Sequence, residues 1–129
     1  MQYRELFIHI CEQLGRAKMS LLNGLRILDL STVLMGPYGS QILGDYGADV
    51  IKVEAPEGDV VRQIGPTRNA AMGPLFLNVN RSKRDISLDL KRPGSRDAIL
   101  RLVETVDVLV TNIRPRAMAR LGLSYEDLA

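Results

Sequence analysis

The sequence predicts an α/β fold built from βαβ units around a parallel sheet. Short apolar runs typical of buried strands recur along the chain, at residues 27–30, 50–53 and 107–111. Segments with apolar side chains at helical spacing separate these runs, at residues 37–46 and 93–106. Because each helix returns the chain to the end of the sheet where the next strand begins, this alternation favours parallel strands.

The composition fits one soluble domain, with 46% apolar and 25% charged residues. No apolar run reaches the roughly 18 to 20 residues that span a bilayer, so we expect no membrane-spanning segment. One cysteine, Cys11, and one histidine, His9, cannot supply the roughly four ligands of a zinc site, so we expect no metal. The single cysteine and the absence of a secretory signal pattern favour the cytoplasm.

The charge is distributed unevenly along the chain. Residues 1–61 carry five basic and eight acidic side chains, whereas residues 62–129 carry twelve basic and seven acidic ones. An anionic ligand is therefore expected on the second half. The excess is too small for a nucleic-acid surface, and the absence of tryptophan leaves few aromatic rings on which bases could stack, so nucleic acid is not expected as a partner.

The first βαβ unit is delimited by glycine and proline. Residues 27–30 form the first predicted strand, and Gly36-Pro37 opens a helix over residues 37–46, since proline is tolerated in the first turn. Gly47 closes that helix, and residues 50–53 form the second strand. Both strands are predicted to be buried.

The second half begins with a long segment that lacks any period. Residues 55–80 are rich in glycine and proline, which predicts a long functional loop. Residues 85–90 alternate apolar and polar side chains and predict a short strand. A helix is expected from Pro93, then a buried strand over residues 107–111 and a helix over residues 114–121.

The two ends of the sequence call for separate interpretation. Residues 1–18 predict a helix that is either a leader or extension before the domain, or a genuine helix that packs on it; both alternatives stay open. At the other end, Ser124 and Asp127 are spaced as a capping box that opens a further helix. One turn of helix has little stability of its own, so we expect residues 19–129 to be the N-terminal part of a longer domain.

A dinucleotide site is the first alternative that a βαβ unit raises. Gly36, Gly39 and Gly44 do not have the G-x-G-x-x-G spacing, and Pro37 stands where the backbone would approach a pyrophosphate. The spacing therefore disfavours nicotinamide or flavin binding. The sequence also lacks a Walker lysine and a G-x-S-x-G motif.

Several blocks together carry a more specific resemblance. They are residues 25–30, Gly36-Pro37, residues 47–54 (GADVIKVE), 80–91 (NRSKRDISLDLK), 107–112 (DVLVTN) and 114–117 (RPRA). From Leu22 to its end the chain resembles the family III CoA-transferases, also called the CaiB/BaiF family. That family includes formyl-CoA transferases, carnitine CoA-transferases and 2-methylacyl-CoA racemases.

The resemblance implies an enzyme that transfers coenzyme A between an acyl-CoA thioester and a carboxylic acid. It implies the N-terminal part of a large Rossmann-like domain that binds coenzyme A, a smaller second domain, and an interlocked homodimer. The alternatives are epimerisation of the 2-methylacyl-CoA racemase type and a non-catalytic, truncated fragment that binds coenzyme A. In this family the catalytic acid lies beyond the position of Ala129, so no catalytic residue is assigned and the 129 residues alone are expected to be inactive.

The resemblance also implies contacts to coenzyme A. The expected contact residues are Thr32, Val33 and Leu34 for the pantetheine and thioester, Leu88, Asp89, Leu90 and Lys91 near the adenine, and Ala117 and Arg120 for the adenosine and phosphates. The basic side chains expected near the phosphates are Arg81, Lys83, Arg84, Lys91, Arg92 and Arg120.

Four positions depart from the family pattern and narrow these expectations. Ala55 stands where many relatives have an arginine, which removes one nucleotide contact, and Arg116 replaces a glycine. Thr32 and Leu34 stand where formyl-specific members carry histidine and glutamine, so formyl transfer is disfavoured.

Overall fold

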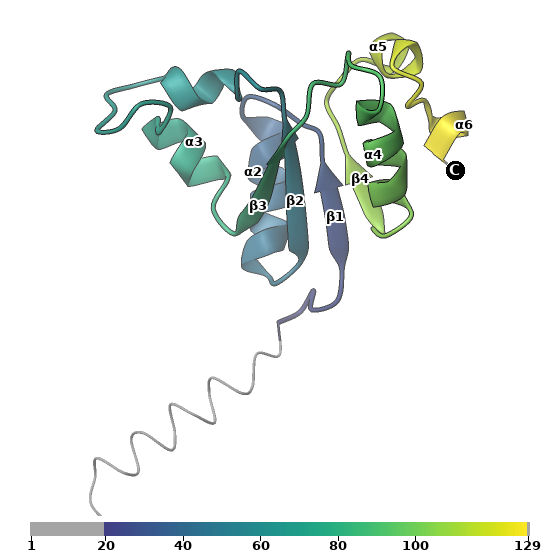
Figure 1. Ribbon diagram of the computed structural model, residues 1–129. Coiled ribbons are helices and arrows are strands. Elements are labelled where there is room, and N and C mark those ends of the chain that lie inside the picture. The colour runs from purple at the N-terminus through teal and green to yellow at the C-terminus, as the bar shows by residue number, and fades with distance from the viewer. Residues whose placement is uncertain (1–19, 129) are drawn as a thin grey trace, which may run out of the picture.

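A four-stranded parallel sheet forms the centre of the protein (Figure 1). The computed structural model describes residues 20–128. The strands are β1 (Arg26–Asp29), β2 (Asp49–Glu54), β3 (Lys83–Ser87) and β4 (Val108–Val110), in the spatial order β3-β2-β1-β4. All three strand pairs are parallel, which confirms the predicted fold class. The predicted helix over residues 1–18 lies outside the described residues.

Helices cover both faces of the sheet. They are α2 (Met35–Asp45), the 3-10 helix η1 (Val60–Gln63), α3 (Pro74–Val79), α4 (Ser95–Val103), α5 (Pro115–Arg120) and α6 (Tyr125–Leu128). In Figure 1, α2 lies behind the sheet and α4 in front of it, beside β4. The chain therefore crosses from one face to the other between β3 and β4.

Successive residues of a strand point to opposite faces, and this alternation divides the core in two. Leu28 and Ile51 pack with Ile99 of α4 on one face. Ile27 and Val50 pack on the other face, with α2 beside them. The first of these cores is the larger and also includes Met118 of α5 and Leu123.

The interpretation of residues 55–80 as one loop is wrong, because the segment contains η1 and α3. Asp59 accepts a hydrogen bond from the backbone N–H of Val61 and so caps η1. Pro74 is the first residue of α3, where its missing N–H removes no helical bond. Helices of four and six residues are too short to give the sequence a detectable period.

Several element boundaries also differ from prediction. The predicted strand over residues 85–90 is wrong by two to three residues, since β3 ends at Ser87. The helix expected from Pro93 begins at Ser95, after Gly94 with a φ of +88°. The helix predicted over residues 37–46 begins at Met35, which leaves Pro37 in its first turn.

The features predicted near the C-terminal end are confirmed. Gly122 follows α5 with a φ of +65°, a conformation that glycine adopts without strain. Ser124 and Asp127 form the predicted capping box: the Ser124 N–H donates to Asp127 Oδ2 at 2.9 Å, and the Asp127 N–H donates to Ser124 Oγ at 3.4 Å.

Candidate functional site

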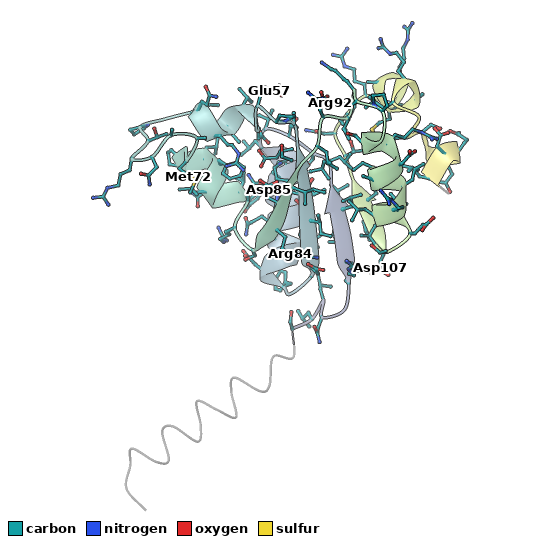
Figure 2. The ribbon with its side chains drawn as sticks, viewed as in Figure 1. Glu57, Met72, Arg84, Asp85, Arg92 and Asp107 are labelled. Atoms are coloured by element: carbon teal, nitrogen blue, oxygen red, sulfur yellow. The ribbon has the colours of Figure 1, made fainter. Side chains whose placement is uncertain are left out.

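The carboxyl ends of the four strands meet at one end of the sheet. Figure 2 places Glu57 and Arg92 at this end, and Arg84 and Asp107 at the opposite end. After β1 the chain continues into α2 on one face of the sheet. The neighbouring strand β4 follows α4, which lies on the other face. In open α/β sheets, ligands bind in the crevice outside such a reversal point. The ends of β1 and β4 are therefore the candidate site.

A pair of hydrogen bonds joins the two loops at this point. The Thr32 N–H donates to Asn112 Oδ1 at 3.1 Å, and Asn112 Nδ2 donates to the Thr32 carbonyl oxygen at 2.8 Å. Thr32 lies three residues after the end of β1, next to the buried Ser31, and Asn112 lies two residues after the end of β4. The side chain of Asn112 therefore fixes the relative position of the two loops that border the crevice.

The loop after β1 contains an unusual backbone conformation. Val33 has a φ of +71°, in the left-handed region that β-branched residues rarely adopt. Its N–H donates to both carboxylate oxygens of Asp59, at 3.2 and 3.1 Å. Val33 is 45% exposed, so burial of this residue does not account for its conformation.

A layer of buried charges lies on the α2 face of the sheet, and its first pair joins Asp29 and Lys83. Lys83 Nζ lies 3.0 Å from Asp29 Oδ2, and the two side chains are 1% and 0% exposed. Lys83 also donates to the Pro37 carbonyl oxygen. Burial would raise the pKa of Asp29, but hydrogen bonds from Ser31 and Ser40 and the charge of Lys83 hold it below its usual value. Asp29 is therefore ionised at neutral pH.

Lys52 and Asp59 form the second buried pair. Lys52 Nζ lies 3.2 Å from Asp59 Oδ2, with side-chain exposures of 1% and 0%. Lys52 also donates to the Ser31 carbonyl oxygen at 2.8 Å. This lysine thus contacts both the loop after β1 and the aspartate that holds Val33.

Arg62 joins the buried Glu54 of this layer to the exposed Asp85. Its guanidinium donates to both carboxylate oxygens of Glu54, at 2.7 and 2.8 Å, and to Asp85 at 2.8 Å. It also lies 3.6 Å from the ring centroid of Phe76. Burial would raise the pKa of Glu54, but Arg62 holds it below its usual value. Burial and the neighbouring Glu54 raise the pKa of Asp85.

Sequence reasoning missed this charged layer because it took residues 50–53 as an apolar run. A signal was present: Lys52 and Glu54 alternate with Ile51 and Val53, and period-two alternation places the charged pair on one face. Alternation of apolar and charged residues normally indicates a strand with one face exposed to solvent. Both faces of β2 are buried, so here the charged residues form a buried face.

The three segments with expected coenzyme A contacts all lie at the carboxyl end of the sheet. Thr32, Val33 and Leu34 are exposed in the loop after β1. Leu88 and Leu90 pack against the larger core, so they support the loop after β3. The remaining members lie nearby in the same loop or on α5: Asp89, Lys91, Ala117 and Arg120.

The expected contact residues after β3 and on α5 differ in their exposure and in their hydrogen bonds. Asp89 accepts a hydrogen bond from the Lys91 N–H at 3.0 Å and lies 3.4 Å from Arg92 Nε. Lys91 and Arg120 are exposed, and Ala117 is half-buried. The exposed cations at this end of the sheet are therefore accessible to an anionic ligand.

Three of the six basic residues expected near phosphates are engaged elsewhere. Arg81 pairs with Asp45 at 2.6 Å, and Arg84 pairs with Asp49 at 2.6 Å. Both pairs lie at the amino end of the sheet, and Lys83 is enclosed by its own partners. Local carboxylates bind these three cations, and their contact with phosphates stays a prediction. Lys91, Arg92 and Arg120 remain at the carboxyl end.

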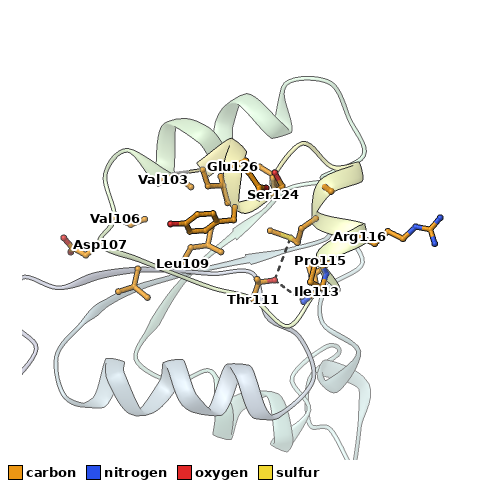
Figure 3. Close-up of a pocket in the computed structure, with 16 residues that line it drawn as sticks. Val103, Val106, Asp107, Leu109, Thr111, Ile113, Pro115, Arg116, Ser124 and Glu126 are labelled. Atoms are coloured by element: carbon orange, nitrogen blue, oxygen red, sulfur yellow. Dashed lines mark hydrogen bonds between the residues drawn. The ribbon is translucent and has the colours of Figure 1, made fainter.

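An apolar groove of about 870 Å³ lies along the outer edge of β4 (Figure 3). Val103, Leu109 and Ile113 are among its lining residues. Arg116 lines it too, but Figure 3 shows its guanidinium extending away from the groove. Because its lining includes Thr111 of the loop after β4 and Ala119 of α5, the groove borders the candidate site.

Over residues 20–128, no helix is long and apolar enough to cross a membrane. Within that same part of the chain, no three His, Cys, Asp or Glu side chains lie close enough together to hold a metal ion.

Comparison with known proteins gives consistent results. The model of CoA-transferase family III matches residues 22–129. The chain is 45% identical over 114 residues to a succinyl-CoA:mesaconate CoA-transferase of Haloarcula hispanica, covering 85% of this chain and 29% of the relative. It is 46% identical over 108 residues to an acetyl-CoA:oxalate CoA-transferase of Acetobacter aceti, covering 83% of this chain and 28% of the relative.

A solved structure agrees with both. The crystal structure of a CaiB/BaiF family protein from Brucella suis superimposes with a TM-score of 0.80 at 39% identity, covering 84% of this chain and 30% of that one. The chain thus spans less than a third of the length of these relatives. By its match over residues 22–129, the chain belongs to CoA-transferase family III.

Proposed function

We propose that this chain forms the N-terminal part of the coenzyme A-binding domain of an enzyme that transfers coenzyme A from an acyl-CoA thioester to a carboxylic acid. Family membership carries the proposal. The described site supports it, because the loops after β1 and β4 meet at the end of the sheet where α/β proteins bind nucleotides.

The proposed ligand contacts follow the segments at that end. Thr32, Val33 and Leu34 would contact the pantetheine and thioester, and the residues 88–91 and α5 would contact the nucleotide. Coenzyme A carries a diphosphate and a 3′-phosphate, and the exposed cations Lys91 and Arg120 are suited to them. The segment with the expected thioester contacts and the segments with the expected phosphate contacts share this end.

The chemistry of transfer requires a nucleophile that none of the described residues is proposed to supply. In covalent transfer, a carboxylate attacks the thioester carbonyl, releases the CoA thiolate and forms a mixed anhydride. The described aspartates that contact the loop after β1, Asp29 and Asp59, are buried and held by lysines, so their oxygens are not free to attack. We therefore propose that residues 20–128 bind and orient coenzyme A, and that the catalytic carboxylate lies outside them.

The assembly and compartment are proposed on separate grounds. A homodimer is implied by the family resemblance and supported by the outer face of α2, where Met35, Tyr38 and Tyr46 are 75%, 47% and 53% exposed. Sedimentation of the whole protein tests this: a dimer is expected, and a monomer at micromolar concentration would contradict it. The single cysteine of the sequence supports a cytoplasmic location.

The test of the activity is a transfer assay on the whole protein. Acetyl-CoA and succinyl-CoA are offered as donors with oxalate, mesaconate or glutarate as acceptor, and mass spectrometry follows the new thioester. Appearance of the acceptor's CoA thioester is the expected result. Exchange of the α-proton of 2-methylacyl-CoA without transfer would instead support the racemase-type alternative. Absence of both reactions would contradict the proposal.

A further inference from the structure

The loop after β1 is held by side chains from three other parts of the chain. The Ser31 carbonyl oxygen accepts from Lys52, both backbone groups of Thr32 bond to Asn112, and the Val33 N–H donates to Asp59. Backbone groups of three successive residues are thus fixed by side chains and not by regular secondary structure. Loops normally expose such groups to water.

Val33 is the position where this restraint is needed. Valine disfavours a φ of +71°, because its Cβ crowds the carbonyl oxygen in the left-handed region. Its half-exposed side chain does not explain the conformation, and the N–H bond to Asp59 is the contact that does. A strained residue persists only where its surroundings hold it, and such residues cluster at functional sites.

The Asp59 carboxylate is held in a fixed position by its own contacts. Its side chain is fully buried, and its carboxylate is fixed by Lys52 at 3.2 Å and by the Val61 N–H at 3.2 Å. Glu54 further accepts the Asp59 N–H at 2.8 Å, which anchors the backbone. Asp59 therefore has no freedom to follow a shift of the loop.

We infer that Asp59, held by Lys52, is a positioning residue that keeps Val33 in its left-handed conformation and so presents residues 32–34 to the acyl-CoA. This inference rests on the proposed function, because that function makes residues 32–34 a ligand contact. Asp59 itself touches no ligand. Its action passes through the backbone of Val33.

Glycine at position 33 provides the decisive comparison, because glycine adopts a positive φ without strain. In the parent protein, Val33→Gly is expected to weaken coenzyme A affinity by a small factor, because the proposed contact of the Val33 side chain is lost while Asp59 still holds the loop. Asp59→Asn alone should weaken affinity by about tenfold, as the binding-competent loop becomes less populated. Adding Val33→Gly to Asp59→Asn should then restore affinity at least about threefold.

The experiment measures coenzyme A binding by calorimetry for these four proteins, each expressed as the whole chain, together with Asp49→Asn as control. Asp49 pairs with Arg26 and Arg84 at the opposite end of the sheet, so its variant should bind coenzyme A like the parent. Amide exchange of residues 30–35 is followed in parallel by mass spectrometry. It should accelerate in Asp59→Asn and stay unchanged in Asp49→Asn.

Either of two results would overturn the inference: unchanged exchange of residues 30–35 in Asp59→Asn, or a Val33→Gly effect of the same factor in both backgrounds. If Asp59→Asn does not fold, the pair Lys52→Met with Asp59→Leu replaces it, since removing both partners leaves no uncompensated buried charge. If the parent protein does not bind coenzyme A, the proposed function fails, and the exchange measurement alone then decides the role of Asp59.

Discussion

Replacing Lys83 with methionine should lower the free energy of unfolding by about 3 to 5 kcal/mol, the usual loss when one partner of a buried ion pair is removed. The Asp29 carboxylate, with a side chain that is 0% exposed, would keep its charge without the compensating cation. The Pro37 carbonyl oxygen and Asn80 Oδ1 would each lose a donor, at 2.8 and 2.9 Å. Methionine has a similar length, so loss of volume contributes little.

Arg84→Met is the matched control, because Arg84 follows Lys83 on the same strand and also pairs with an aspartate. Its side chain and that of Asp49 are 62% and 41% exposed, and exposed pairs contribute about 0 to 1 kcal/mol. Urea denaturation followed by circular dichroism measures both losses, provided that the m-value is unchanged. The two neighbouring substitutions should therefore differ several-fold in their effect.

Adding Asp29→Asn to Lys83→Met tests the cause of the loss. Asparagine removes the uncompensated charge; its amide oxygen can still accept from the Ser31 hydroxyl, and its Nδ2 can donate to the Ser40 hydroxyl oxygen. The double variant should lose less than the sum of the two single losses. Equal losses for Lys83→Met and Arg84→Met, or strict additivity in the double variant, would refute the reasoning.

Three other predictions concern acid, glycine and phosphate. The pKa values of Asp29 and Glu54 lie below their usual range in the folded protein, so their contribution is complete above the unfolded carboxyl pKa near 4 and is lost as the pH falls through the folded values. Asp85 has a raised pKa and contributes in the opposite sense, but it is one group against the two with lowered pKa values. The urea midpoint of unfolding should therefore be lower at pH 3 than at pH 7, and equal midpoints would contradict this. Gly73→Ala should destabilise the fold by about 2 kcal/mol or more, because the new Cβ would lie 2.6 Å from the Val61 carbonyl oxygen. Gly39→Ala meets open space in α2 and should stabilise the fold by about 0.5 to 1 kcal/mol. Thermal melts in which both variants change the stability in the same direction would contradict this packing. Arg120→Ala should weaken coenzyme A binding by about ten- to a hundredfold in calorimetry. Arg101→Ala, at an exposed residue of α4, is the control and should bind coenzyme A like the parent; an equal effect of both variants would remove Arg120 from the site.

The parallel sheet could be predicted because its signals are local. Residues 27–30 and 107–111 are apolar runs bounded by polar residues, and Gly122 and the Ser124 capping box mark helix ends by their chemistry. Residues 60–63 and 74–79 could not be recognised, because such short helices depend on contacts with distant residues. Gly73 illustrates this: its N–H donates to the Arg62 carbonyl oxygen at 2.7 Å, eleven positions away.

The pairing of residues within the charged layer could not be predicted for the same reason. Asp29 and Lys83 are 54 residues apart in the sequence, and Val33 depends on Asp59, 26 residues later. A basic run such as Arg81-Ser82-Lys83-Arg84 gives no sign that its lysine points inward while its arginines pair at the surface. The division follows from the two-residue period of β3, which only the placement of that strand reveals.

The affinity for coenzyme A relative to NAD is the most direct test of the central claim, that the carboxyl end of this sheet binds coenzyme A. Both ligands carry an adenosine diphosphate, but only coenzyme A carries a 3′-phosphate and a pantetheine arm. Calorimetry on the whole protein should give an affinity for coenzyme A at least about tenfold higher than for NAD, with dephospho-CoA between them. Equal affinity for all three ligands, or preference for NAD, would contradict the account.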